Sequence, residues 1–173
     1  MVVLITPVCA ADIGSVIALA RQVWQRTYPG IISQEQIDYM LAQRYTRERL
    51  LAELDTSGIW WDKATVDGCL AGFSACMTMP AGGEMKLDKL YVDPDRQRGG
   101  IGARLIEQVE CHAHAAGCRA LILAVNKRNE RAIAAYRKHG FAVRDSVCVD
   151  IGRGFVMDDF IMLRSLPAPA APL

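Results

Sequence analysis

The feature that most constrains the fold is a glycine-rich segment at residues 97–102, which reads QRGGIG. Residues 87–92 before it alternate like a half-buried strand, and Leu105, Ile106 and Val109 after it repeat with helical spacing. The first amides of a helix have no partner within the helix, and the helix dipole adds positive charge at that end. Glycine also lets a bulky anion approach the backbone closely. The segment therefore predicts a pyrophosphate site at the start of a helix.

Two common nucleotide motifs do not match this segment. A dinucleotide-binding fingerprint would need a third small residue where Leu105 stands. A phosphate loop of the NTPase type would need Gly-Lys followed by Ser or Thr, which is absent. Glycines before a helix also serve as plain turn residues, so the rest of the chain has to identify the ligand.

The expected elements follow one another as strand, helices, three antiparallel strands, helix, strand, helix and two strands. Helices are expected to end near Thr27, to start at the Ser33 cap, and to cover 46–54, 100–116 and 129–139. Asp67-Gly68 reads as a tight hairpin turn. Strands are expected at residues 2–5, 59–66, 69–79, 85–92, 119–125, 141–149 and 155–163. This order predicts a mixed α/β sheet.

The length and composition of the chain limit the number of domains and the kinds of partner that it can bind. A chain of 173 residues, 51% of them hydrophobic, supports one core, so residues 1–166 are expected to form a single domain. Residues 167–173, a Pro/Ala tail, have nothing to bury and are expected to be disordered. The 20 basic residues nearly balance the 19 acidic ones, which argues against nucleic acid or a membrane surface as partner. Without a signal peptide or a long apolar run, the protein is expected to be cytoplasmic.

Two cysteines and two histidines within residues 111–118 are candidate metal ligands. Cys111, His114 and Cys118 would share a helix face, but His112 points elsewhere and no second ligand pair follows. The six cysteines form no CxxC pair and read as reduced thiols. No metal is expected.

The segment resembles the GNAT superfamily of N-acetyltransferases, whose Q/R-x-x-G-x-G/A motif is matched by Gln97, Gly100 and Gly102. The preceding residues 90–94, LYVDP, are similar to the cofactor strand of that family. Asn129, Ala132 and Tyr136, followed by Gly140-Phe141, are similar to its second cofactor motif. The resemblance implies a GNAT-type α/β (α+β) fold with a mixed, mainly antiparallel central sheet of about seven strands flanked by helices.

The resemblance further implies an acetyl-CoA-dependent N-acetyltransferase. The amides of residues 98–103 would hold the pyrophosphate, and the backbone of residues 90–92 would pair with the pantetheine arm. Asn129 and Ala132 would flank the far end of that arm. The implied cofactor residues are Leu90, Tyr91, Val92, Gln97, Arg98, Gly99, Gly100, Ile101, Gly102, Ala103, Asn129 and Ala132.

The chemistry needs a base and an acid. An alkyl amine with a pKa near ~10 is mostly protonated at neutral pH and must lose a proton before it attacks the thioester. Asp88 lies on the cofactor strand at a position where several family members carry Glu, and it is expected to act through water. An ion pair of Asp88 with Lys86 or Lys89 is the alternative. By resemblance, Tyr136 would protonate the departing thiolate; a half-buried core ring is its alternative.

The acceptor is the least determined part of the site. Trp24, Tyr28, Asp38 and Asp158 are candidate substrate residues, and Asp158 and Asp159 lie on opposite faces of one strand, so one of them at most faces a pocket. The resemblance points weakly to the bacterial polyamine-acetylating type of GNAT enzyme. Acetylation of a protein or peptide amine and a non-catalytic acetyl-CoA-binding regulatory module remain alternatives, and a homodimer stays open.

Overall fold

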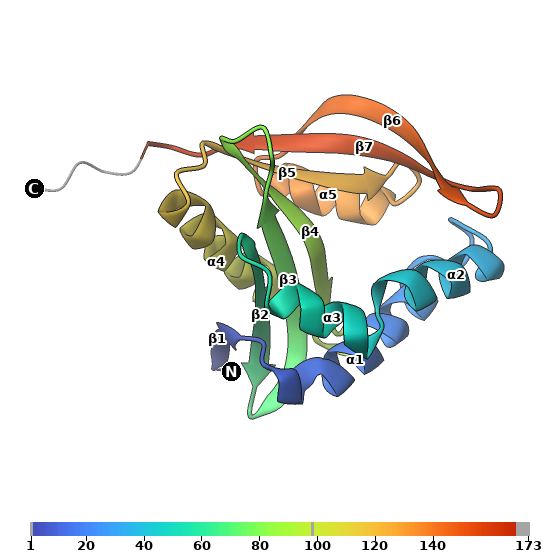
Figure 1. Ribbon diagram of the computed structural model, residues 1–173, viewed down its shortest axis with the longest axis horizontal. Coiled ribbons are helices and arrows are strands. Elements are labelled where there is room, and N and C mark those ends of the chain that lie inside the picture. Colours follow the sequence, from blue (N-terminus) through green and yellow to red (C-terminus); the bar gives the residue numbers. More distant parts are fainter. Residues whose placement is uncertain (1, 98, 169–173) are drawn as a thin grey trace, which may run out of the picture. The chain divides into compact units, whose positions relative to one another are not determined.

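A computed structural model describes residues 2–97 and 99–168 of the chain. Their elements occur in the expected order (Figure 1). The strands are β1 Val3–Pro7, β2 Ile59–Val66, β3 Cys69–Thr78, β4 Glu84–Val92, β5 Ala120–Asn126, β6 Ala142–Gly152 and β7 Phe155–Ser165. The α-helices are α1 Ile13–Thr27, α2 Gln34–Arg44, α3 Arg47–Leu54, α4 Ile101–Ala115 and α5 Glu130–Lys138. Two short 3-10 helices are η1 Ala10–Asp12 and η2 Pro94–Arg96.

The seven strands form a mixed sheet with the order β1-β2-β3-β4-β5-β7-β6. The β1–β2, β5–β7 and β6–β7 pairs are antiparallel, and the β4–β5 pair is parallel. The expected mixed, mainly antiparallel sheet of about seven strands is confirmed. None of the described helices has the length and apolar character that crossing a bilayer requires.

The described residues group into two compact units. The first unit holds the residues up to Cys76 together with Lys89–Val109, and the second holds Met77–Asp88 and the residues from Glu110 onward. Strands β3 and β4 and helix α4 thus contribute residues to both units. The single domain expected for residues 1–166 stays a prediction, and residues 169–173 of the expected tail lie outside the described part of the chain.

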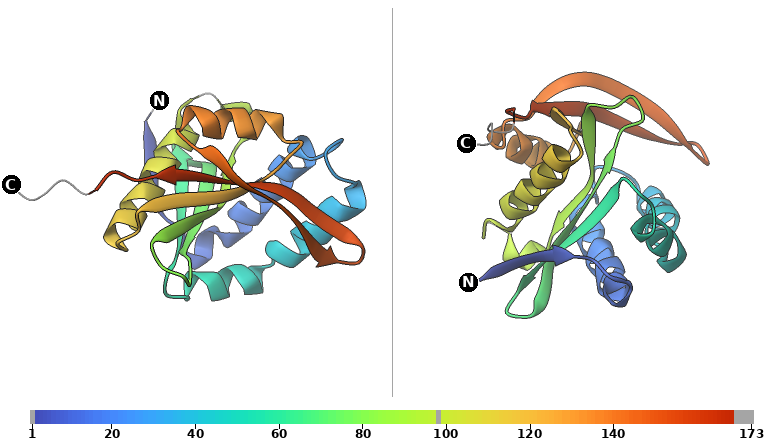
Figure 2. Two further views of the ribbon diagram at one scale, coloured as in Figure 1. Left: turned by 90° about the horizontal axis from the view of Figure 1, so that it is seen from above. Right: turned by 60° about the vertical axis from the view of Figure 1, so that its left-hand side comes forward.

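In the first unit, helices cover both faces of the strands (Figure 2). On one face, the indole N–H of Trp61 on β2 donates to Glu53 of α3 at 3.1 Å. On the other face, Ile101 and Leu105 of α4 pack against a cluster that includes Ala64 and Val66 of the same strand. The alternation of side chains along β2 places these two groups on opposite faces. Strand β2 is therefore held in a two-sided core.

In the second unit, α5 lies along one face of β5, β7 and β6 (Figures 1 and 2). The hairpin of β6 and β7 corrects an expectation, because the first strand was expected to end at residue 149 and the second to begin at residue 155. Strand β6 instead continues to Gly152, and the turn consists of Arg153 (φ 55°) and Gly154 (φ 77°). Two successive residues with positive φ are typical of a type I′ hairpin turn. Asp67 (φ 50°) and Gly68 (φ 79°) form the same kind of turn, as expected.

Gly72 on β3 yields a stability prediction. A Cβ at this position would lie 2.9 Å from the backbone oxygen of Tyr91, 3.2 Å from Ile101 and 3.3 Å from Leu105. The Tyr91 carbonyl belongs to β4 and cannot move away without shifting that strand. We expect Gly72→Ala to lower the free energy of unfolding by about 1–3 kcal/mol, the usual cost of overpacking. Urea denaturation measures this change.

Gly14 offers a matched control within helix α1. A Cβ there meets nothing within 4 Å, and alanine is favoured over glycine inside a helix. Gly14→Ala should leave stability unchanged or raise it by up to about 1 kcal/mol. Equal stability of Gly72→Ala and the parent protein would contradict the close approach of β3 to Tyr91.

Candidate active site

The start of α4 presents unpaired backbone amides in the first unit. The Gly100 carbonyl accepts the first helical hydrogen bond, from the Arg104 amide at 3.1 Å. The three residues that follow, Ile101, Gly102 and Ala103, therefore lie in the helix turn whose N–H groups have no helical acceptor. Gly100 has φ 76°, and neither it nor the half-buried Gly102 would bring a Cβ close to a neighbour's backbone. The arrangement suits an anion at the helix start; Arg98 lies outside the described residues.

Strand β4, which precedes this loop, packs one of its faces against the core and is held by hydrogen bonds at its end. Leu90 and Val92 pack against the cluster that contains Ile101. The side-chain amide of Gln97 donates to the Val92 carbonyl at 3.4 Å. The Asp93 amide donates to the Ala71 carbonyl at 2.9 Å. These contacts fix the end of β4 and the beginning of the loop relative to the start of α4.

In the second unit, the parallel pairing of β4 with β5 is short. Its register runs from Glu84 opposite Ala120 to Lys86 opposite Ile122. On its other edge, β5 pairs with β7 along all of Ala120–Asn126. The edge of β5 that faces β4 thus continues for residues 123–126 beyond the paired stretch. An extended amide chain can bind such an edge by adding to it like a further strand.

Helix α5 carries the second set of expected cofactor residues. The Asn129 side chain accepts a hydrogen bond from the Ala132 amide at 3.2 Å, so Asn129 is the N-cap of α5. Tyr136 is half-buried in the last turn of the helix, and its ring makes a T-shaped contact with the Phe141 ring at 5.8 Å between centroids. The Phe141 ring thus packs against the phenol ring of Tyr136 and limits its orientation.

Asp88 lies on β4 in the second unit and contacts a lysine of the same strand. The Lys86 ammonium lies 3.2 Å from a carboxylate oxygen of Asp88, whose side chain is 8% exposed, against 33% for Lys86. The ion pair that the sequence left open is therefore formed with Lys86. Lys89 is 2% exposed and instead lies 3.5 Å from Glu53 and over the Trp61 ring.

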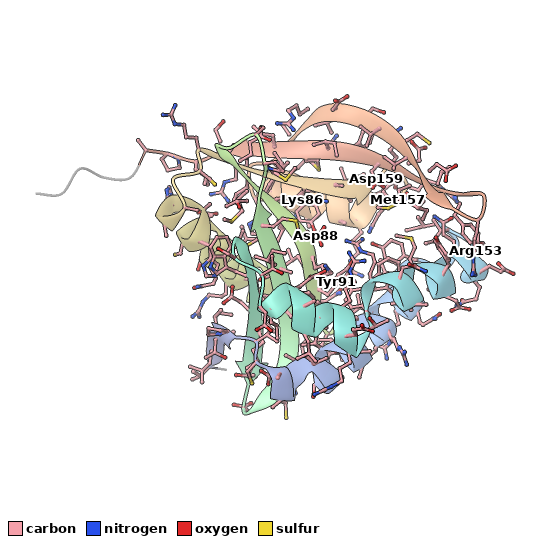
Figure 3. All side chains as sticks on the ribbon, viewed as in Figure 1. Lys86, Asp88, Tyr91, Arg153, Met157 and Asp159 are labelled. Carbon is pink, nitrogen blue, oxygen red and sulfur yellow. The ribbon has the colours of Figure 1, made fainter. Side chains whose placement is uncertain are left out.

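The two neighbouring carboxylates on β7 differ in surroundings. Asp158 is 53% exposed at its side chain and forms an ion pair with Lys127. Asp159 is 5% exposed. Paired residues of adjacent strands share a face, so the register from Lys86 to Ile122 and from Ile122 to Leu163 places Asp159 on the face of Lys86 and Asp88. These side chains gather in one part of Figure 3, with Met157.

The aromatic candidates of the first unit are part of a buried cluster. Trp24 is 2% exposed, and its ring centroid lies 4.5 Å from that of Tyr28 and 6.3 Å from those of Tyr45 and Tyr91. Within the described residues, neither the Trp24 indole N–H nor the Tyr45 hydroxyl has a hydrogen-bond partner. Burial raises the pKa of Tyr45 well above its usual range, so this hydroxyl stays protonated. Two uncharged polar groups are thereby available inside an apolar cluster.

One predicted candidate is a surface group, and two residues near the candidate site were not predicted from the sequence. Asp38 is exposed on α2 and accepts a hydrogen bond from Gln34 at 2.8 Å. Sequence reasoning did not single out Lys86 or Tyr45 for the site, because neither belongs to a motif. Alternation along β4 would have placed Lys86 beside Asp88. Among the described residues, no group of three or more His, Cys, Asp or Glu side chains could hold a metal ion.

Comparison with known proteins identifies a matching family. Residues 18–141 match the model of the acetyltransferase (GNAT) family. The chain is 30% identical over 151 residues to the spermidine N(1)-acetyltransferase of Thermoplasma acidophilum, covering 85% of this chain and 90% of that protein. It is 35% identical over 114 residues to an IAA acetyltransferase of Azospirillum brasilense, covering 64% of this chain and 74% of that one.

Solved structures show the same fold. The crystal structure of the PaiA N-acetyltransferase of Thermoplasma acidophilum in complex with coenzyme A superposes with a TM-score of 0.84 at 29% identity, covering 96% of this chain and all (100%) of that one. A GCN5-related N-acetyltransferase of Rhodopseudomonas palustris gives a TM-score of 0.79 at 24% identity, covering 96% and 99%. At that lower identity the likeness concerns the fold alone.

Proposed function

We propose that this chain, which belongs to the acetyltransferase (GNAT) family and is an N-acetyltransferase with acetyl-CoA as donor, acetylates a primary amine of a small molecule. A polyamine is the acceptor class that we propose. The observation that carries the acceptor proposal is the pair of enclosed carboxylates, Asp88 and Asp159, on one face of the second unit's strands. Enclosed carboxylates attract cations strongly because water screens them little. The name of the Thermoplasma spermidine acetyltransferase supports the same class.

For the donor, we propose that the backbone amides of residues 98–103 hold the pyrophosphate, with Gln97 before them. The helix start at Gly100 supports this role, because it combines unpaired N–H groups with the positive end of the α4 dipole. Backbone groups of residues 90–92 would bind the pantetheine arm, with Asn129 and Ala132 at its far end. The short β4–β5 register supports binding of an added extended chain.

The proposed reaction is a direct transfer in a ternary complex. Asp88, through a water molecule, takes a proton from the ammonium of the acceptor. The amine nitrogen then attacks the acetyl carbonyl carbon and a C–N bond forms. The nitrogen releases its second proton to water, and the C–S bond of the thioester breaks. A backbone amide on the strand of residues 90–92 would stabilise the oxyanion. Tyr136 donates its hydroxyl proton to the departing CoA thiolate. Asp88 then loses its proton to water and Tyr136 regains one from water.

On the acceptor side, we propose Asp159 rather than Asp158 as the anchor of a second ammonium. Asp158 already pairs with Lys127 and is mostly exposed, so an additional cation would gain little there. In the first unit, Trp24, Tyr28 and Asp38 stay candidate acceptor residues. A homodimer remains a prediction.

Replacement of Asp88 tests its role as base. We expect Asp88→Asn to lower kcat by about 100-fold, the lower end of the usual effect of a general base. Asp88→Asn should also shift or flatten the pH–rate profile of the wild type. Asp67→Asn is the matched control, because it makes the same substitution in an exposed hairpin turn that Asn tolerates. A wild-type profile for Asp88→Asn would assign the base elsewhere.

A panel of acceptors tests the function itself. Release of CoA thiol from acetyl-CoA is followed with polyamines, monoamines, aminoglycosides and peptides with a free N-terminus. We expect polyamines to give the highest kcat/KM. Preference for peptides would favour the protein-acetylating alternative. Tight binding of acetyl-CoA without thiol release for any amine would favour a regulatory module.

A further inference from the structure

Lys86 places a primary alkylammonium on the carboxylate that we assign as base. Its Nζ lies 3.2 Å from Asp88, and the two residues share a face because they are two positions apart on β4. Asp88 is the enclosed partner, with 8% of its side chain exposed, and Lys86 the more open one with 33%. The Lys86 ammonium can regain water when it leaves, whereas an enclosed carboxylate left without a cation is costly, so Asp88 should accept a replacement cation.

The charges on this face of the second unit are unevenly distributed. At the positions of β4, β5 and β7 that share the face, the described residues include three acidic side chains, Glu84, Asp88 and Asp159. Lys86 is the single basic residue at those positions. Glu84 forms an ion pair with Arg144 of β6. Lys86 is thus the strand residue that supplies positive charge beside the proposed base (Figure 3).

The side chain of Lys86 and a polyamine end in the same chemical group. Four methylene groups carry the lysine ammonium, and a comparable alkyl chain carries the terminal ammonium of 1,4-diaminobutane. A carboxylate that holds one such group can hold the other. Because the Lys86 ammonium lies against Asp88, the acceptor's ammonium and the water that relays its proton need the position that Lys86 occupies.

We infer that Lys86 is an internal competitor that occupies Asp88 until the acceptor's ammonium displaces it, and that it thereby sets the affinity for cationic acceptors. This inference rests on the proposed function, because it assumes that Asp88 receives the acceptor. Lys86 is a specificity-determining residue and takes no part in the chemical step. Its removal should therefore act on binding of the amine rather than on turnover at saturation.

The test removes the positive charge of Lys86 and keeps the length of its side chain. We expect Lys86→Met to lower KM for butylamine and for 1,4-diaminobutane about three- to fivefold, which is the effect on affinity expected from one partly exposed ion pair. We expect kcat to stay within about twofold of wild type. Lys86→Arg keeps a cation at the position and should give a KM closer to wild type. Lys138→Met, the same change on an exposed lysine of α5, is the control for a general effect of charge.

Calorimetry measures the affinity for 1,4-diaminobutane without turnover, so failure of this inference can be distinguished from failure of the proposed function. In the Asp88→Asn background, Lys86→Met should no longer strengthen binding, because the contested carboxylate is gone. Equal KM of wild type and Lys86→Met with ready turnover would overturn the competitor role and leave the proposed function standing. Tighter amine binding in Lys86→Met with no turnover by either protein would support the competitor role and overturn the proposed function.

Discussion

Gly100→Asp is expected to weaken acetyl-CoA binding by about 10- to 100-fold. The substitution places a carboxylate at the helix start that we assign to the pyrophosphate. Two unit charges about 5 Å apart repel by about 3 kcal/mol at an effective dielectric constant near 20, and solvent screening reduces this value. Isothermal titration of acetyl-CoA measures the change directly.

Gly100→Asn is the matched control for this experiment. Asparagine and aspartate have nearly the same size, and both tolerate the positive φ of 76° at this position. No neighbouring atom would lie within 4 Å of either Cβ. The difference between the two variants therefore isolates the charge. Equal affinity of Gly100→Asp and Gly100→Asn would remove the loop from its assigned role.

Tyr136→Phe is expected to lower kcat by about 100-fold while leaving the affinity for acetyl-CoA nearly unchanged. The hydroxyl is the proposed proton donor to the thiolate, and loss of a general acid usually costs at least that much. The ring contact with Phe141 survives the substitution, so the helix should stay in place. Single-turnover kinetics and coenzyme titration separate the two quantities.

Tyr39→Phe removes a hydroxyl from α2, outside the proposed machinery, and serves as the control. It should leave kcat within about twofold of wild type. Normal turnover of Tyr136→Phe would return that phenol to a packing role and leave the thiolate to be protonated by solvent.

Local sequence rules account for most of the fold. The residues Asp67 and Gly68 specify a type I′ turn, because both adopt positive φ at little cost. The same turn at Arg153 was missed, since arginine rarely adopts positive φ and the glycines on either side suggested a longer loop. Ser33 accepts from the Gln36 amide at 3.1 Å, as a helix cap should.

The geometry of the candidate site could be predicted where it depends on neighbours in sequence, but not where it depends on the register of the strands. The helix start at Gly100 and the cap at Asn129 follow from local patterns. The choice between Asp158 and Asp159 required the pairing of β7 with β5, which sets the face of each side chain. The burial of Trp24 required the packing of α1 against residues distant in sequence.

The most direct test of direct transfer follows both products and the protein in one reaction. Acetyl-CoA and spermidine are mixed with the enzyme, and N-acetylated amine, CoA thiol and the intact mass of the protein are measured over time. We predict equal amounts of acetylated amine and thiol, with no acetylated protein at any time point. Thiol release without acetylated amine, or an acetyl-enzyme that forms and decays at the rate of turnover, would contradict acetyl transfer to the amine in a ternary complex.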